Sequence, residues 1–176
     1  NAQIYAGIDL TIRPAKGPER ATPGAGPEQT VRELALHKAQ EVAQTCAPED
    51  IVIAADTIVY LDGVILGKPK DTADAARMLA ALSGREHTVY TGVAVLRGGE
   101  TRLAAEHTAV RFRTLMPEEI ARYIATGEPM DKAGAYGIQG RGALFVAHLD
   151  GDYFNVMGLP LCRLGQLLNE LGVELL

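Results

Sequence analysis

The sequence contains no tryptophan, only two cysteines and no long hydrophobic run. Cys46 and Cys162 form no Cys-x-x-Cys motif, which argues against a disulfide framework and against a structural zinc site. We therefore expect two buried thiols in a protein of the reducing cytosol. The apolar runs, such as residues 51–55, fall far short of the roughly 18 residues that a membrane-spanning helix needs. Residues 1–5 lack the basic and apolar pattern of a signal peptide. These absences predict a cytoplasmic protein without a membrane partner.

The charge balance narrows the choice of partners. Lys and Arg total 17 against 22 Asp and Glu, which gives a formal net charge of −5. A protein that coats duplex nucleic acid needs a basic surface, so this balance argues against a nucleic-acid partner, although a local basic pocket for a nucleotide remains compatible with it. With 47% hydrophobic and 22% charged residues among 176, the composition and length predict one globular domain over residues 1–176.

Several ligand-binding motifs are absent as well. Residues 63–69 resemble a phosphate-binding loop, but three residues rather than four separate the glycines, and Pro69 stands where Ser or Thr should hold magnesium. The sequence contains no Gly-x-Gly-x-x-Gly, His-Glu-x-x-His or Gly-x-Ser-x-Gly motif, and its histidines share no metal-ligand spacing. These absences remove support for a P-loop enzyme, a dinucleotide-binding fold, a zinc protease and a serine hydrolase.

The periodicity of apolar residues, with caps and breakers, predicts the fold class. Helices are expected at residues 30–46, 71–82, 117–126 and 160–171. Strands are expected at residues 51–55, 58–61, 64–66, 88–96, 101–113, 143–149 and 153–156. Asp62-Gly63, Gly98-Gly99 and Asp150-Gly151 should join neighbouring strands into hairpins, and the proline- and glycine-rich residues 13–28 should form a loop. We predict an α/β protein, a single domain with a central mixed β-sheet flanked by helices.

Three charged residues are candidates for a site, each with an ordinary alternative. Asp56 follows the apolar run at residues 51–55, and the carboxyl end of a buried strand is where α/β sheets bind ligands. A turn cap or a lysine partner would explain Asp56 equally well. Lys38 fits a solvated helix face, and Lys68, between Gly67 and Pro69, fits an edge lysine that prevents aggregation.

Residues 131–140 form the least ordinary segment of the chain. They combine an acid, a base, a phenol, an amide and three glycines. Glycine allows the backbone to approach a ligand closely, and the amide of Gln139 can donate to and accept from the edge of a nucleobase. We favour a binding loop here over a packed turn whose polar groups satisfy one another.

Short runs along the chain match one protein family in order. They are Ala55-Asp56-Thr57-Ile58-Val59, Gly67-Lys68-Pro69, Met78-Leu79, Leu82-Ser83-Gly84, His87-Thr88-Val89-Tyr90-Thr91-Gly92-Val93, Gly127-Glu128-Pro129-Met130-Asp131-Lys132-Ala133-Gly134-Ala135-Tyr136-Gly137-Ile138-Gln139-Gly140, Gly151-Asp152-Tyr153 and Gly158-Leu159-Pro160-Leu161. Each run alone is a weak signal, but together they are specific. From Gly7 to Leu171 the chain resembles the Maf family of nucleoside triphosphate pyrophosphatases.

The resemblance implies a reaction and a substrate class. Members of the family hydrolyse a nucleoside triphosphate to the monophosphate and pyrophosphate with a divalent metal, Mg²⁺ or Mn²⁺. The Asp-Lys-Ala-Gly-Ala-Tyr-Gly-Ile-Gln loop is similar to that of the branch that acts on dTTP and UTP, with modified pyrimidine triphosphates as further candidates. Two alternatives stay open. One is an inosine-triphosphate-type house-cleaning pyrophosphatase, and the other is a nucleotide-binding regulator of cell division without turnover.

The resemblance also implies roles for individual residues. Asp56 matches the catalytic carboxylate, which would also bind the metal. Thr57 and Gln139 match positions that govern substrate choice. Lys38 and Lys68 match lysines that face the triphosphate.

Other expectations from the resemblance concern the start of the chain and its assembly. Glu19, within the loop at residues 13–28, matches a further acidic active-site residue and is expected to be a second metal ligand. The Ser-x-Ser-Pro-Arg-Arg signature of the family, which grips phosphate, does not occur in the printed sequence, and we expect it upstream of Ala6. A homodimer is the expected assembly.

Overall fold

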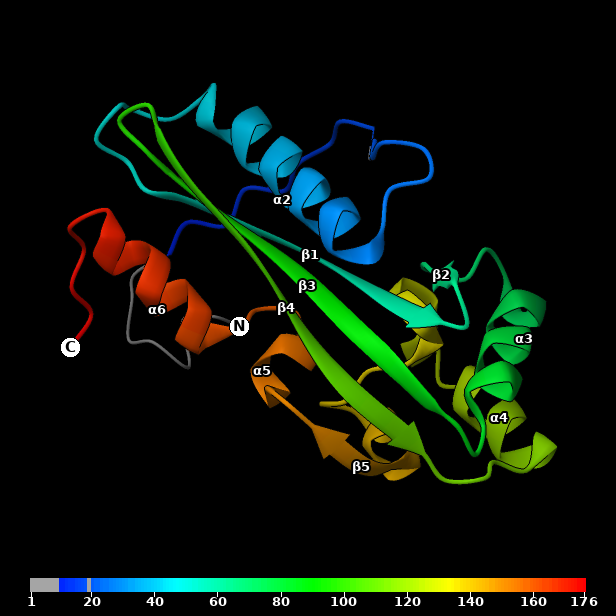
Figure 1. Cartoon of the computed structure of the whole chain (residues 1–176). Helices are drawn as coiled ribbons and strands as arrows, with labels where there is room; N and C mark the ends of the chain where they lie inside the picture. The colour runs from blue at the N-terminus through cyan, green and yellow to red at the C-terminus, as the bar shows by residue number, and fades with distance from the viewer. Residues whose placement is uncertain (1–9, 19) are drawn as a thin grey trace. The chain divides into compact units, whose positions relative to one another are not determined.

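The computed structural model describes residues 10–18 and 20–176, so the site predicted at Glu19 lies outside the described residues. In chain order the helices and strands are α2 (Pro27–Ala43), β1 (Val52–Leu61), β2 (Val64–Leu66), α3 (Thr72–Leu82), β3 (Glu86–Arg97), β4 (Glu100–Phe112), α4 (Pro117–Ile124), β5 (Val146–Asp150), α5 (Tyr153–Val156) and α6 (Leu161–Glu170) (Figure 1). Three 3₁₀ turns, η1 (Glu128–Asp131), η2 (Ala133–Ala135) and η3 (Arg141–Phe145), lie between α4 and β5.

The strands form one five-stranded sheet in the order β2-β1-β3-β4-β5. The turn between β1 and β2 uses Asp62 and Gly63, both with positive φ, as a two-residue hairpin of this twist requires. The register pairs Val59 with Leu66, and β4 pairs with β5 in the same antiparallel sense. The α/β class with flanking helices is confirmed, but the sheet is antiparallel rather than mixed. The β1–β2 and β3–β4 connections are hairpins, which reverse the direction of the chain, whereas α3 precedes β3 and α4 precedes β5.

The chain divides into two compact units. The first unit contains the described residues up to Asp56 together with Thr91–Glu106 and Gly158–Leu176. The second unit contains Thr57–Tyr90 and His107–Met157. β1, β3 and β4 are long enough to contribute residues to both units.

In the first unit, α2 and α6 cover opposite faces of the strands (Figure 1). Val52 of β1 packs with Ala35 of α2, whereas its neighbour Ile53 packs with Leu164 of α6. Consecutive strand residues point to opposite faces, so alternate residues of the unbroken apolar run at the start of β1 pack against α2 and against α6.

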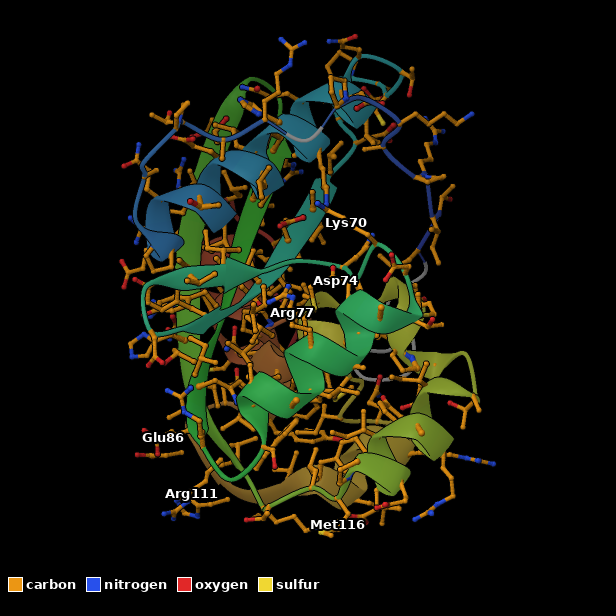
Figure 2. All side chains as sticks on the ribbon, turned by 90° about the vertical axis from the view of Figure 1, so that its right-hand side faces the viewer. Lys70, Asp74, Arg77, Glu86, Arg111 and Met116 are labelled. Carbon is orange, nitrogen blue, oxygen red and sulfur yellow. The ribbon has the colours of Figure 1, made fainter. Side chains whose placement is uncertain are left out.

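In the second unit, α3 packs beside α4 and the 3₁₀ turns (Figure 1). Leu79 and Leu82 of α3 are fully buried in this core, with Phe112 of β4. At the start of α3, the Asp74 carboxylate accepts hydrogen bonds from the Lys70 backbone N–H and from the Arg77 guanidinium (Figure 2). The helix predicted at residues 71–82 is thereby confirmed.

The predictions for Tyr153–Val156 and for the two cysteines are wrong. Tyr153–Val156 forms the short helix α5 rather than a strand, because the Asp152 carboxylate accepts a hydrogen bond from the Phe154 N–H, 2.7 Å away, and caps it. The cysteines are free, but Cys46 is half-buried and Cys162 is exposed. Among the described residues, no helix is long and apolar enough to cross a membrane.

Candidate functional site

Asp56 lies in the middle of β1 rather than at its carboxyl end. β1 runs for 10 residues from Val52 to Leu61, so the expectation that the strand stops at residue 55 is wrong. The reason lies in the next residues, since Thr57, Ile58 and Val59 are β-branched and favour continued strand. The Asp56 side chain is only 9% exposed, which makes it a partly desolvated carboxylate on a rigid element.

The structure brings Lys38 of α2 against Asp56. The Lys38 ammonium donates to Oδ1 of Asp56, and the two form an ion pair. Asp56 is two and four residues beyond Ala54 and Val52, which pack with α2, so strand alternation directs its side chain to the same helix. Lys38 is itself half-buried rather than on a solvated face, and low exposure strengthens the attraction between the two charges.

A glycine permits the close approach of α2 to the sheet. A Cβ built on Gly92 of β3 would lie 2.1 Å from the Val31 carbonyl oxygen in the first turns of α2. Real Cβ atoms do not come so close, so any larger residue must push the helix away. The Lys38–Asp56 pair therefore depends on Gly92 as well as on its own side chains.

In the second unit, the Lys68 segment adjoins the loop at residues 131–140. The Gly134 N–H donates to the Gly67 carbonyl oxygen at 3.0 Å. Gly134 has a φ of 68°, and a Cβ there would lie 2.7 Å from Cγ2 of Val59 on β1, so only glycine fits. The Lys132 ammonium, 2.8 Å from the Asp131 carboxylate, holds the pKa of Asp131 below its usual value, and the charge of Lys68 adds to this.

A buried histidine anchors the same loop. His87 Nε2 lies 2.8 Å from the Tyr136 hydroxyl, and both rings pack edge-on against Phe112. Burial lowers the pKa of His87 to about 4, so the imidazole is neutral at pH 7. The ring packs edge-on against Tyr136 and bonds its hydroxyl, so it supports the loop from within the core.

The predicted residues thus fall into two groups. Lys38 and Asp56 meet in the first unit, while Lys68 and the loop that carries Gln139 meet in the second. Gln139 and Lys68 are exposed. Thr57 follows Asp56 directly, in the alternate register of β1.

Among residues 10–18 and 20–176, no group of three His, Cys, Asp or Glu side chains could by itself hold a metal ion. Asp56 nevertheless fits a magnesium-type site, because Mg²⁺ takes one or two carboxylates and completes its shell with substrate phosphates and water. A carboxylate also has enough lone pairs to keep Lys38 while it binds a metal. The role of Glu19 as a second ligand stays a prediction.

The fold and the site define an α/β protein with a carboxylate–lysine pair and a glycine-rich loop. A model of the Maf family, described as Maf-like protein, matches residues 3–171. The chain belongs to the Maf family.

Curated relatives match over nearly the same range. A dTTP/UTP pyrophosphatase of Moorella thermoacetica is 52% identical over 170 residues, which are 96% of this chain and 87% of the relative. The dTTP/UTP pyrophosphatase of Symbiobacterium thermophilum is 51% identical over 94% of this chain and 85% of the relative. The protein of the same name from Bacillus pumilus is 48% identical over 96% and 88%.

Proposed function

We propose that this protein hydrolyses dTTP and UTP to the monophosphate and pyrophosphate. The observation that carries the proposal is the Lys38–Asp56 pair, a partly desolvated carboxylate on a rigid strand that is held in place by a cation. The names of relatives that match most of the chain at about half identity support the substrate class. The loop from Asp131 to Gln139, which resembles that of the dTTP- and UTP-specific branch, supports it further.

The chemistry follows from the positions of the charged groups. Water attacks the α-phosphorus, so that a bond from the water oxygen to phosphorus forms while the bond to the pyrophosphate oxygen breaks. Asp56 orients this water and receives its proton. Lys38 fixes the orientation of the Asp56 carboxylate and presents positive charge to the phosphates.

The divalent metal adds to what the residues supply. A free aspartate is a weak base at pH 7. Asp56 would hold the ion together with phosphate oxygens, and Glu19 is the predicted second ligand. A bound Mg²⁺ or Mn²⁺ would acidify a coordinated water and offset the charge of the phosphates.

Substrate choice belongs to the second unit in this proposal. Lys68 offsets negative charge on the triphosphate, and the Gln139 amide pairs with the edge of a pyrimidine. Thr57, next to Asp56, also contributes to the choice of substrate. Residues 1–176 would act as one Maf-like domain. The homodimer, the cytoplasmic location and the absence of a nucleic-acid partner stay predictions.

The test is pyrophosphate release from a panel of nucleoside triphosphates with Mg²⁺ or Mn²⁺. We expect release from dTTP and UTP, and its loss in Asp56→Asn while nucleotide binding is retained. Asp74→Asn is the matched control, because Asp74 is also paired with a cation, Arg77, but lies at the start of α3. Equal loss of binding and turnover in Asp56→Asn would contradict the catalytic role.

Other outcomes identify the alternatives. Release from deaminated purine triphosphates in preference to dTTP and UTP would show the house-cleaning pyrophosphatase. Nucleotide binding without any release would show the regulator.

A further inference from the structure

Glu128 occupies the centre of a hydrogen-bond network beneath the turn that carries Gln139. Its Oε2 accepts from the Arg141 N–H at 3.0 Å, and its Oε1 accepts from the Gly142 N–H at 3.1 Å. The Glu128 side chain therefore joins the residue that begins η1 to the backbone that begins η3, on the far side of Gln139 in the sequence.

Tyr123 of α4 extends this network to the near side of Gln139. Its hydroxyl donates to Oε1 of Glu128 at 2.8 Å and accepts from the Gly137 N–H at 3.1 Å. Burial raises the pKa of Tyr123 above its usual range, and the Glu128 charge adds to this rise, so the hydroxyl remains a donor at neutral pH. Together, Tyr123 and Glu128 bind the backbone at residues 137, 141 and 142, which brackets Gln139.

Glu128 is an ionised group despite its partial burial. Desolvation alone would raise its pKa, but the hydrogen bonds from Arg141, Gly142 and Tyr123 outweigh desolvation and hold the pKa below its usual value. Hydrogen bonds to a charged acceptor are stronger than those between neutral groups. The turn is thus fixed by charge-assisted bonds rather than by apolar contacts of Gln139, which is exposed.

The backbone lies directly against the carboxylate. A Cβ built on Gly140, the residue after Gln139, would lie 2.4 Å from Oε1 of Glu128. Gly140 also closes the turn, because its N–H donates to the Gly137 carbonyl oxygen at 3.2 Å. The conformation of the turn at residues 137–140 and the position of Glu128 therefore determine each other.

We propose that Glu128, with Tyr123, is a positioning residue for substrate selection, which holds the Gln139 amide where it meets the nucleobase. This inference rests on the proposed function, since it assigns Gln139 a base-contacting role. Glu128 does not touch the reacting phosphate in this proposal, so it should govern how tightly and how selectively a pyrimidine nucleotide binds rather than the rate of the chemical step.

The decisive variants are Glu128→Gln and Glu128→Ala, compared with Glu119→Gln. The Gln amide replaces one acceptor oxygen by a donor, so at least one of the N–H groups that Glu128 serves is left without its acceptor, and Ala removes both oxygens. Glu119 is the matched control, because it accepts two bonds from Arg113 and one from the Met116 N–H. These bonds lie at the start of α4, where Met116 is located (Figure 2).

We expect KM for dTTP and UTP to rise about tenfold in Glu128→Gln, equivalent to about 1.4 kcal/mol, and further in Glu128→Ala, while kcat changes less than about twofold. The ratio of kcat/KM for pyrimidine over purine triphosphates should fall in the same order. Amide hydrogen exchange in residues 137–142 should accelerate in both Glu128 variants. Glu119→Gln should lower thermal stability without any of these changes.

The outcomes separate this inference from the proposed function. A wild-type protein that releases no pyrophosphate from dTTP or UTP would overturn the proposed function and this inference with it. An active wild type whose Glu128 variants keep their KM and their pyrimidine preference, or lose kcat alone, would overturn only the positioning role. Faster amide exchange with unchanged selectivity would also overturn it, because the turn would then be held without consequence for the base.

Discussion

Acidification should destabilise this protein through His87. The loss of stability should begin near pH 6.5, well above the pH at which the carboxylates of the protein take up protons. The native pKa of His87 is about 4, lowered by burial from the usual 6.5. The ring is 3% exposed, and its Nδ1 has no hydrogen-bond partner among the residues that the structure describes. A proton on this ring would place a charge in the apolar cluster with Phe112 and Tyr136.

The sign follows from the difference in bound protons. Below pH 6.5 the unfolded chain protonates His87 while the native chain does not, so the stability is complete above pH 6.5 and is lost as the pH falls toward 4. From the two pKa values, the loss is about 2 kcal/mol at pH 5 and about 3 kcal/mol at pH 4. The depressed pKa values of Glu119 and Glu128, whose usual value is 4.5, reduce stability mainly below pH 4.5, so the change between pH 7 and pH 5 reports on His87.

Urea unfolding at pH 7, 6 and 5, followed by circular dichroism, measures this effect. His87→Gln retains hydrogen-bonding capacity toward Tyr136 but cannot titrate. It should be less stable than the wild type at pH 7, yet lose about 2 kcal/mol less between pH 7 and pH 5. For His148→Gln, at an exposed position on β5, the free energy of unfolding should depend on pH as it does in the wild type. The same pH dependence in His87→Gln as in the wild type would refute the assignment of the acid sensitivity to His87.

Two further predictions concern the packing and the site. Gly92→Ala should destabilise the protein by about 3 kcal/mol in urea unfolding, because its Cβ would overlap the Val31 carbonyl. Gly165→Ala in α6 should instead stabilise the protein by about 0.5 to 1 kcal/mol, because a Cβ there meets nothing within 4 Å. A destabilised Gly165→Ala would contradict the packing argument. Lys38→Met should lower kcat/KM for dTTP by at least about tenfold, equivalent to about 1.4 kcal/mol, because it removes the cation that orients Asp56. The control is Lys16→Met, a lysine of the first unit whose charge acts on Glu41 rather than on Asp56. Steady-state kinetics measures the effect, and equal values of kcat/KM in the two variants would refute the prediction.

The sequence predicted most elements but misplaced boundaries where two local signals conflict. α2 begins at Pro27 and ends at Ala43, earlier than the predicted residues 30–46. Proline at the first position and Glu28 in the first turn favour this start, but the many prolines and glycines around them suggested a loop. Tyr153–Val156 has strand-like composition, but the Asp152 cap and the buried Asn155 amide, which donates to the Val89 carbonyl and to the Thr108 hydroxyl, favour a helix.

The network of Glu128 shows what a motif match leaves out. Glu128 lies inside the matched run from Gly127 to Gly140, yet its residue type suggests only an exposed acid after a helix. Its importance comes from backbone N–H groups at residues 141 and 142, which carry no sequence signal because every non-proline residue has one. Such a role becomes visible only when the path of the backbone is known.

The Lys38–Asp56 pair, by contrast, can be predicted from the helix periodicity of α2 and the strand alternation of β1. Lys38 is three residues beyond Ala35 and four before Val42, and therefore lies on the apolar stripe of α2 that packs against the sheet. Asp56 shares the alternate register of Val52 and Ala54 on the strand that this stripe covers. Each charge, taken alone, has an ordinary explanation: a solvated helix face for Lys38, and a turn cap or a lysine partner for Asp56. When the two residues lie on facing apolar surfaces, each loses much of its contact with water. The ion pair between them compensates for this loss, so the two patterns together predict it.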